Sequence, residues 1–137
     1  DTEIINRKLI KLVSKKIATK EQINDLLFSM KVTKHLKSNS IVLASNKQTL
    51  GLGIGQTNRY DSLKIAINNM KKNFKSNKFV CASDGFFPFV DSISLLKKNK
   101  CNIIVQPFGS INDNKIIKFA IKNSMSLYFS KKRFFKH

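Results

Sequence analysis

Arginine, histidine and cysteine are scarce in this chain, and long apolar runs are absent. The two histidines, His35 and His137, stand at no metal-ligand spacing from each other or from a cysteine, so no zinc site is readable. Cys81 and Cys101 lack a C-x-x-C partner and lie in predicted buried strands, so we interpret them as reduced core thiols of a cytoplasmic protein. The longest apolar runs span four or five residues, which excludes a membrane span or signal-peptide core in this sequence.

The charge is strongly basic, with 26 Lys and Arg against 8 Asp and Glu and a net charge of +18. Neutralising phosphates with such residues gives non-specific nucleic-acid affinity. Only three of the 26 are arginines, the residue favoured for bidentate recognition of phosphate and guanine. The lysines are spread over nearly every segment beside many Asn and Ile, as AT-rich codon bias would produce. We therefore do not expect nucleic acid as the main partner, and we keep a basic polyanion-binding module as the alternative function.

The 137 residues, 42% of them hydrophobic, suffice for one folded domain. Thr19 and Gln22 have the spacing of a capping box, and the apolar positions that follow predict a helix over 20–36. Residues 4–17 fit a helix and a strand equally, and both alternatives stay open. Strands at 40–45 and 49–54 are predicted to form a hairpin around the turn signal Asn46-Lys47. Further strands are predicted at 79–82, 101–105 and 125–129, and further helices at 59–74, 91–98 and 112–123. Strands separated by helices of this size predict an α/β fold with flanking helices and a mainly parallel sheet.

Glycines 51, 53 and 55 resemble a phosphate-binding loop only superficially. Their G-x-G-x-G spacing lacks the third glycine of the dinucleotide fingerprint and the Gly-Lys-Ser/Thr of a P-loop. Glycines within a strand more often mark a bulge or the close approach of another backbone. We predict one of these structural roles.

The stretch Ser83-Asp84-Gly85-Phe86-Phe87-Pro88-Phe89-Val90-Asp91 links a predicted strand to a predicted helix. Ligands of open α/β sheets bind at such carboxyl strand ends. The aromatic side chains either wall a flat ligand opposite a carboxylate or fill the core, with Asp91 as an N-cap. The loop over 106–110 is predicted at the same sheet edge. Arg133 follows the last strand and is either part of a frayed basic end or a phosphate ligand.

Five motifs in this order resemble one enzyme family. They are Lys37-Ser38-Asn39-Ser40-Ile41-Val42, Gly51-Leu52-Gly53-Ile54-Gly55-Gln56 with Arg59, Ser83-Asp84-Gly85-Phe86-Phe87-Pro88-Phe89 with Asp91, Gln106-Pro107 with Gly109-Ser110, and Arg133-Phe134 with His137. The chain resembles the C-terminal part of the bifunctional purine-biosynthesis enzyme that combines AICAR formyltransferase with IMP cyclohydrolase. Residues 1–137 are expected to be the C-terminal portion of the formyltransferase domain, without the upstream catalytic half and the cyclohydrolase domain.

The resemblance implies a cytidine-deaminase-like fold and transfer of a formyl group from 10-formyltetrahydrofolate, the co-substrate, to the amino group of AICAR. It also implies a cytoplasmic homodimer in the full-length form, and no metal. The family's reactive His and Lys lie upstream of this chain, and Lys34-His35 belongs to a different motif. We therefore predict no catalytic residue here, and a fragment that is inactive alone. A decayed remnant that keeps the fold without a ligand is a further alternative.

The resemblance assigns ligand binding to eight residues. Asn39 would bind the carboxamide region of AICAR, Arg133 its phosphate, and Phe86 and Pro88 would wall the site. Asp91 would accept hydrogen bonds from the pterin. Arg59 is expected on the AICAR side, and Tyr60 and Ser110 on the folate side. Val90 and Phe108 depart from the family pattern, which usually has Arg and a small residue at these positions.

Overall fold

Six strands form one sheet in the order β1-β6-β5-β4-β2-β3 in a computed structural model that describes residues 5–74 and 78–131. Within this part of the chain the strands are β1 Ile10–Leu12, β2 Ile41–Ser45, β3 Gln48–Gly53, β4 Val80–Ser83, β5 Ile103–Pro107 and β6 Ser126–Ser130. The helices are the 3-10 turn Arg7–Leu9, α1 Lys20–Thr33, α2 Arg59–Asn73, α3 Val90–Lys98 and α4 Asp113–Lys122. No described helix is long and apolar enough to cross a membrane.

The sheet is mixed, so the prediction of a mainly parallel sheet was wrong. The β4–β5 and β5–β6 pairs are parallel, whereas the β1–β6, β2–β3 and β2–β4 pairs are antiparallel. A two-residue turn joins β2 to β3, which forces that pair to be antiparallel. The crossover through α2 then makes β4 parallel to β3, but β2 lies between them and is antiparallel to both.

The ambiguous segment at 4–17 contains the 3-10 turn and β1, and no α-helix in its described part. Strand β1 pairs with β6 through Ile10 opposite Ser130 and Leu12 opposite Tyr128. A partner distant in sequence therefore decides its conformation. The predicted capping box of α1 is confirmed, since the Thr19 and Gln22 side chains each accept from the other residue's backbone N–H.

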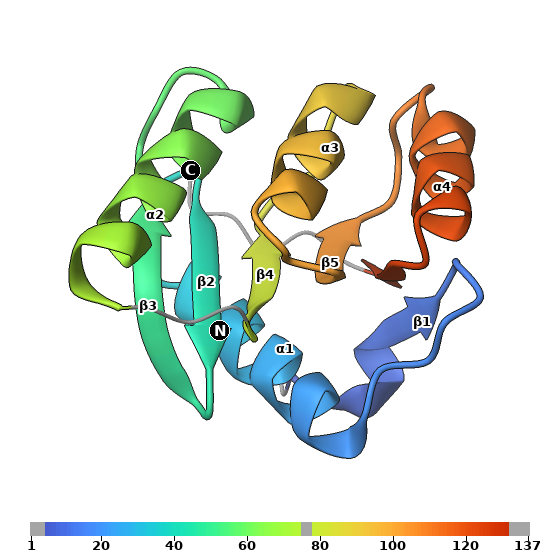
Figure 1. Cartoon of the computed structure of the whole chain (residues 1–137), viewed down its shortest axis with the longest axis horizontal. Helices are drawn as coiled ribbons and strands as arrows, with labels where there is room; N and C mark the ends of the chain where they lie inside the picture. The colour runs from blue at the N-terminus through green and yellow to red at the C-terminus, as the bar shows by residue number, and fades with distance from the viewer. Residues whose placement is uncertain (1–4, 75–77, 132–137) are drawn as a thin grey trace.

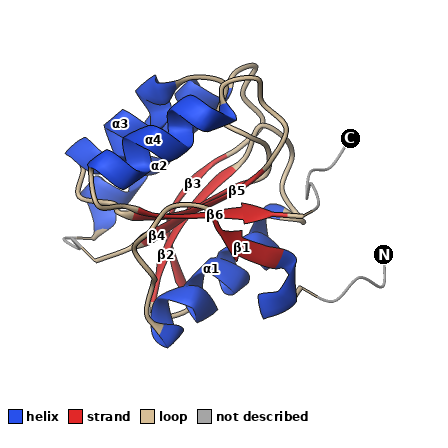
Figure 2. Ribbon diagram, turned by 90° about the vertical axis from the view of Figure 1, so that its right-hand side faces the viewer, coloured by secondary structure: helices blue, strands red, loops and turns tan. Residues whose placement is uncertain are grey.

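Helices cover both faces of the sheet (Figure 2). Helices α2, α3 and α4 lie side by side on one face, while α1 lies on the other (Figure 1). Strand β2 shows the consequence, because Ile41 and Leu43 join the core under α2 to α4 and Val42 and Ala44 join the core under α1. A strand that is buried on both faces reads as a continuous apolar run.

The glycine prediction is confirmed as close backbone approach. A Cβ on Gly51 would lie 2.1 Å from the Ala66 carbonyl oxygen, and one on Gly53 would lie 1.8 Å from the Ser62 carbonyl oxygen. Helix α2 can thus pack directly on β3. The opposite strand also has a register irregularity between Leu43 and Ala44.

Asn46 and Lys47 form the turn between β2 and β3 with positive φ values of 52° and 55°. This is the conformation of a type I′ hairpin turn. The carboxylate of Asp25 in α1 accepts from both backbone N–H groups, at 3.1 Å from Asn46 and 2.9 Å from Lys47. Helix α1 therefore forms hydrogen bonds with the hairpin turn in addition to packing against the sheet.

Both cysteines are buried free thiols, as the sequence predicts. Burial raises the pKa of the Cys101 thiol from its ordinary 9.0 to about 12, although a backbone hydrogen bond of Ile103 lowers it in part. The pKa of Cys81 is also raised well above 9.0, by burial first and by the neighbouring Cys101 second. The folded chain therefore holds both thiols protonated.

Candidate functional site

The predicted ligand loops meet at one edge of the sheet, at the carboxyl ends of β4 and β5. The Phe87 N–H donates to Oε1 of Gln106 at 3.1 Å, and Nδ2 of Asn112 donates to the Pro88 carbonyl oxygen at 2.7 Å. These bonds confirm the prediction that the two loops share an edge. Two loops that are far apart in sequence thereby form one surface.

The antiparallel strand β2 brings a third segment to this edge. Its first residue, Ile41, lies opposite Ser83 at the end of β4 and opposite Gly53 at the end of β3. The residues just before β2, including Asn39, therefore lie beside the loop after β4. A parallel β2 would have placed Asn39 at the other edge.

Arg59, the first residue of α2, joins these segments. Its Nη2 donates to Oδ1 of Asn39 at 2.7 Å, and its Nη1 donates to Oδ1 of Asp84 and, at 3.4 Å, to Oγ of Ser83. The Arg59 side chain is 13% exposed and that of Asp84 is 0% exposed. The guanidinium is thus largely shielded from solvent and is held by a carboxylate and an amide.

Asp84 satisfies donors on both sides of Asn39. Its Oδ2 accepts from the Ser38 hydroxyl at 2.8 Å, and its Oδ1 also accepts from the Ser40 backbone N–H at 3.1 Å. The Asp84 N–H in turn donates to the Ser40 carbonyl oxygen at 3.2 Å. A buried carboxylate with several charge-assisted or backbone donors is a rigid anchor.

The Asn39 amide is fixed at both ends. Its Nδ2 donates to the Gln56 carbonyl oxygen at 3.0 Å, and its Oδ1 accepts from Arg59. The Ser62 hydroxyl donates to the Asn39 carbonyl oxygen at 2.6 Å. Since each amide end has further hydrogen-bonding capacity, this side chain can present both a donor and an acceptor in a defined orientation.

The aromatic stretch divides between core and surface. Phe87 is fully buried in the core, Phe86 and Pro88 are half-buried, and Phe89 is 61% exposed. The core interpretation is therefore right for Phe87, while Phe86 and Pro88 remain accessible from the site. Phe108 on the neighbouring loop is also exposed, at 56%, and Val90 packs against the core.

Asp91 does not cap α3, which corrects that interpretation. Phe89 is the N-cap residue and has no side-chain cap bond, while Asp91 lies in the first turn and accepts from the N–H of Ser92 at 2.9 Å. The helix begins one residue earlier than predicted. The Asp91 side chain is exposed at the site edge, as a ligand-binding carboxylate must be.

Ser110 is linked to the loop that contains Pro88 by two hydrogen bonds of Asn112. The Ser110 hydroxyl accepts from the Asn112 N–H at 3.0 Å, and Asn112 bonds Pro88 as described. Tyr60 lies next to Arg59, but its ring faces the Lys64 ammonium at 5.5 Å. Arg133 lies outside the described residues. The structure thus joins Asn39 directly to Arg59 and links Pro88 to Ser110 through Asn112. Within the described part of the chain, no hydrogen bond joins the Tyr60 or Asp91 side chain to either pair.

Among the described residues, two buried polar atoms of this edge, Ser40 Oγ and Gln106 Nε2, have no hydrogen-bond partner. Gln106 is 0% exposed, and its other amide atom holds Phe87. Buried donors without partners are rare in folded proteins and point to a water or ligand atom. Gln106 Nε2 is therefore a buried donor without a partner among the described residues, next to the loop that the Oε1 atom of the same side chain holds at Phe87.

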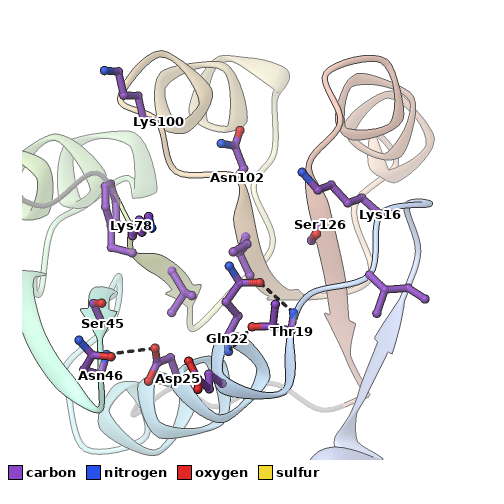
Figure 3. A pocket seen from close by; sticks show the side chains of 15 residues that line it. Lys16, Thr19, Gln22, Asp25, Ser45, Asn46, Lys78, Lys100, Asn102 and Ser126 are labelled. Carbon is purple, nitrogen blue, oxygen red and sulfur yellow. Dashed lines mark hydrogen bonds between the residues drawn. The ribbon is translucent and has the colours of Figure 1, made fainter.

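A groove lies at the opposite edge of the sheet, near the start of α1 (Figure 3). Its volume is about 770 Å³, and Lys16, Lys78, Lys100, Asp25 and Asn102 contribute to its lining. None of the predicted site residues lines it. Its lysines stand beside Glu21 and Asp25, so it is not a uniformly basic surface.

The sequence alone did not identify Asp84, Ser38, Gln106 and Asn112 as parts of the site. Asp84 and Ser38 stand inside motifs that resemble the family, but nothing in the motifs shows that one bonds the other. Asn112 appeared only as the start of a helix. Their roles come from contacts across 19 to 46 residues of sequence.

The comparisons with known proteins agree with these motifs. The model of a family described as AICARFT/IMPCHase bienzyme matches residues 1–69. The bifunctional purine biosynthesis protein PurH of Buchnera aphidicola subsp. Baizongia pistaciae is 51% identical over 135 residues, which are 98% of this chain. The PurH proteins of Persephonella marina and Aquifex aeolicus are 43% and 42% identical over all of it. The chain spans about a quarter of the length of these relatives, 26%, 26% and 27% respectively.

Proposed function

This chain belongs to the AICARFT/IMPCHase bienzyme family, and we propose that it is the C-terminal, substrate-binding portion of an AICAR formyltransferase domain with a cytidine-deaminase-like fold. The proposed reaction moves a formyl group from 10-formyltetrahydrofolate to the 5-amino group of AICAR. We propose that it takes place in the cytoplasm, in a homodimer. The portion described here binds and positions the two substrates.

The observation that carries the proposal is the fixed amide of Asn39. Its hydrogen bonds to Arg59 and to the Gln56 carbonyl hold it in one orientation at the edge of the sheet. A carboxamide, as in AICAR, offers one acceptor and two donors, which an oriented amide can match. Arg59 stays beside Asn39 as its support, and its side chain is only 13% exposed.

The second wall fits a flat heterocycle. Phe86 and Pro88 are half-buried, and the side chain of Gln106 holds the Phe87 N–H between them. Pro88, Ser110, Tyr60 and Asp91 would hold the folate, which when bound supplies the formyl group. The exposed Asp91 carboxylate suits the donor-rich edge of a pterin.

Formyl transfer to this amine also needs a general base and a cation that stabilises the tetrahedral oxyanion, because the amine lone pair is delocalised into the ring. Among the described residues of the site there is no histidine, and the Arg59 guanidinium already binds Asp84 and Asn39. We assign both to the family's upstream His and Lys. Residues 5–131 would then contribute mainly by holding the substrates at reacting distance, which is itself a large part of the rate enhancement in two-substrate reactions.

The test is ligand binding by the natural polypeptide that carries this chain, with calorimetric titration of AICAR and of 10-formylfolate. Asn39→Ala should weaken AICAR binding about tenfold or more, the effect of losing one or two oriented hydrogen bonds. Asn68→Ala, an exposed asparagine of α2, is the matched control and should bind like the wild type.

Absence of AICAR binding by the folded wild type would refute the proposal and favour a decayed remnant. Equal binding by the wild type and Asn39→Ala would refute the role of the amide. Binding to nucleic acid that falls steeply with salt, without AICAR binding, would favour the polyanion-binding alternative.

A further inference from the structure

We propose that Asp84 is a positioning residue that sets the orientation of the Asn39 amide, and with it the affinity for the carboxamide-bearing substrate. The inference rests on the proposed function, because it assumes that Asn39 contacts that substrate. Asp84 itself faces no ligand, since its side chain is fully buried. Its effect must pass through the groups that it binds.

The first route runs through Arg59. Asp84 Oδ1 accepts from Nη1 of Arg59, and Nη2 of the same guanidinium donates to Oδ1 of Asn39 at 2.7 Å. The guanidinium is a rigid plane, so fixing one nitrogen fixes the direction of the other. Asp84 therefore determines where Arg59 presents its donor to Asn39.

The second route runs through the backbone on either side of Asn39. Asp84 Oδ2 accepts from the Ser38 hydroxyl at 2.8 Å, and Oδ1 accepts from the Ser40 N–H at 3.1 Å. One carboxylate thus holds both sequence neighbours of Asn39 and its side-chain partner. A neutral amide at position 84 would keep an acceptor for Arg59 and Ser40, but it would force the Ser38 hydroxyl to accept instead of donate. It would also remove the negative charge that strengthens the bond to the guanidinium.

A buried ion pair can also be purely structural, and stability alone would not separate the two roles. The geometry offers a sharper difference. The hydrogen bonds of the Asp84 side chain go to Ser38, Ser40 and Arg59, on the Asn39 side of the site. Within the described residues, none goes directly to Pro88, Ser110 or Asp91. A positioning role predicts selective loss of one ligand, whereas a structural role predicts loss of both.

The experiment compares Asp84→Asn with the wild type in the natural polypeptide that carries this chain, by titration of AICAR and of 10-formylfolate. The affinity for AICAR should fall about tenfold or more, while that for 10-formylfolate should stay within about threefold. Ser94→Ala, an exposed serine of α3, is the control and should change neither affinity.

Ser38→Ala is the second variant and removes only one of the Asp84 contacts. It tests the positioning role of Asp84 if Asp84→Asn does not fold. It should weaken AICAR binding about threefold and spare 10-formylfolate. Unchanged affinities, or equal losses for the two ligands in a folded variant, would overturn the inference and leave the proposed function intact. Failure of the wild type to bind either ligand would instead overturn the proposed function.

Discussion

Gly85 lies directly against the guanidinium of Arg59. A Cβ on residue 85 would lie 2.3 Å from Nη2 and 2.8 Å from Cζ. The φ angle of Gly85 is not in the positive range, in contrast to those of Gly55 and Gly109, so space rather than backbone conformation requires glycine here. The absence of a side chain at position 85 is what lets Arg59 reach both Asp84 and Asn39.

Gly85→Ala should therefore destabilise the chain by displacing Arg59 from its bonds. Inserting a methyl group into a filled site costs about 1–3 kcal/mol, and urea unfolding would measure the loss. The same substitution in an Arg59→Ala background should cost at least about 1 kcal/mol less, because the clashing group is gone. Equal costs in the two backgrounds would show that Gly85 is not in contact with Arg59 in solution.

The two buried thiols predict loss of stability at alkaline pH. Unfolded thiols lose their protons near pH 9.0, while folded Cys101 keeps its proton to about pH 12. Above pH 9 the unfolded state binds fewer protons, so the free energy of unfolding falls as pH rises. Each thiol contributes a slope of about 1.4 kcal/mol per pH unit in that window and none below it.

Cys101→Ala isolates this effect from all other titrations. The variant has a lower stability overall because of the lost side chain, but between pH 9.5 and 11 its stability should fall less steeply than that of the wild type, by about 1.4 kcal/mol per pH unit. Urea unfolding at several pH values gives both slopes. Identical slopes would mean that Cys101 ionises in the folded state as easily as in the unfolded one.

Sequence patterns predicted the elements whose causes are local. The capping box of α1 depends on Thr19 and Gln22 alone, and the glycines of β3 could be interpreted from their spacing. The relative direction of the strands in the sheet could not be predicted in this way. Each βαβ unit was predicted correctly, but the position of β2 between β3 and β4 depends on pairing that no local pattern records.

The site shows the same division. Strand ends predicted that the loop after residue 82 and the loop over 106–110 share one edge, because carboxyl strand ends and their loops can be predicted in order along the chain. Asn39 and Arg59 were assigned to the site only through the resemblance. The bonds of Asp84 to Ser38 and of Asn112 to Pro88 could not be predicted, since they join segments 46 and 24 residues apart. Position within a motif indicates that a residue matters, and only the tertiary contacts indicate what it does.

The contact of Asp25 with the β2–β3 turn gives a final prediction, on how α1 stabilises the hairpin. Each carboxylate oxygen accepts from one backbone N–H, that of Asn46 or Lys47. Asp25→Asn leaves one acceptor and places an NH2 group against the other N–H, so it should cost about 1–3 kcal/mol in urea unfolding.

Glu21→Gln is the matched control, since it removes the same charge from an exposed side chain of the same helix and should change stability by less than about 0.5 kcal/mol. The Asn46 and Lys47 amides should also exchange their hydrogens faster in Asp25→Asn, because local opening of the turn becomes easier when its acceptor is lost. Equal effects of the two substitutions would mean that the charge, and not the paired acceptors, links α1 to the hairpin.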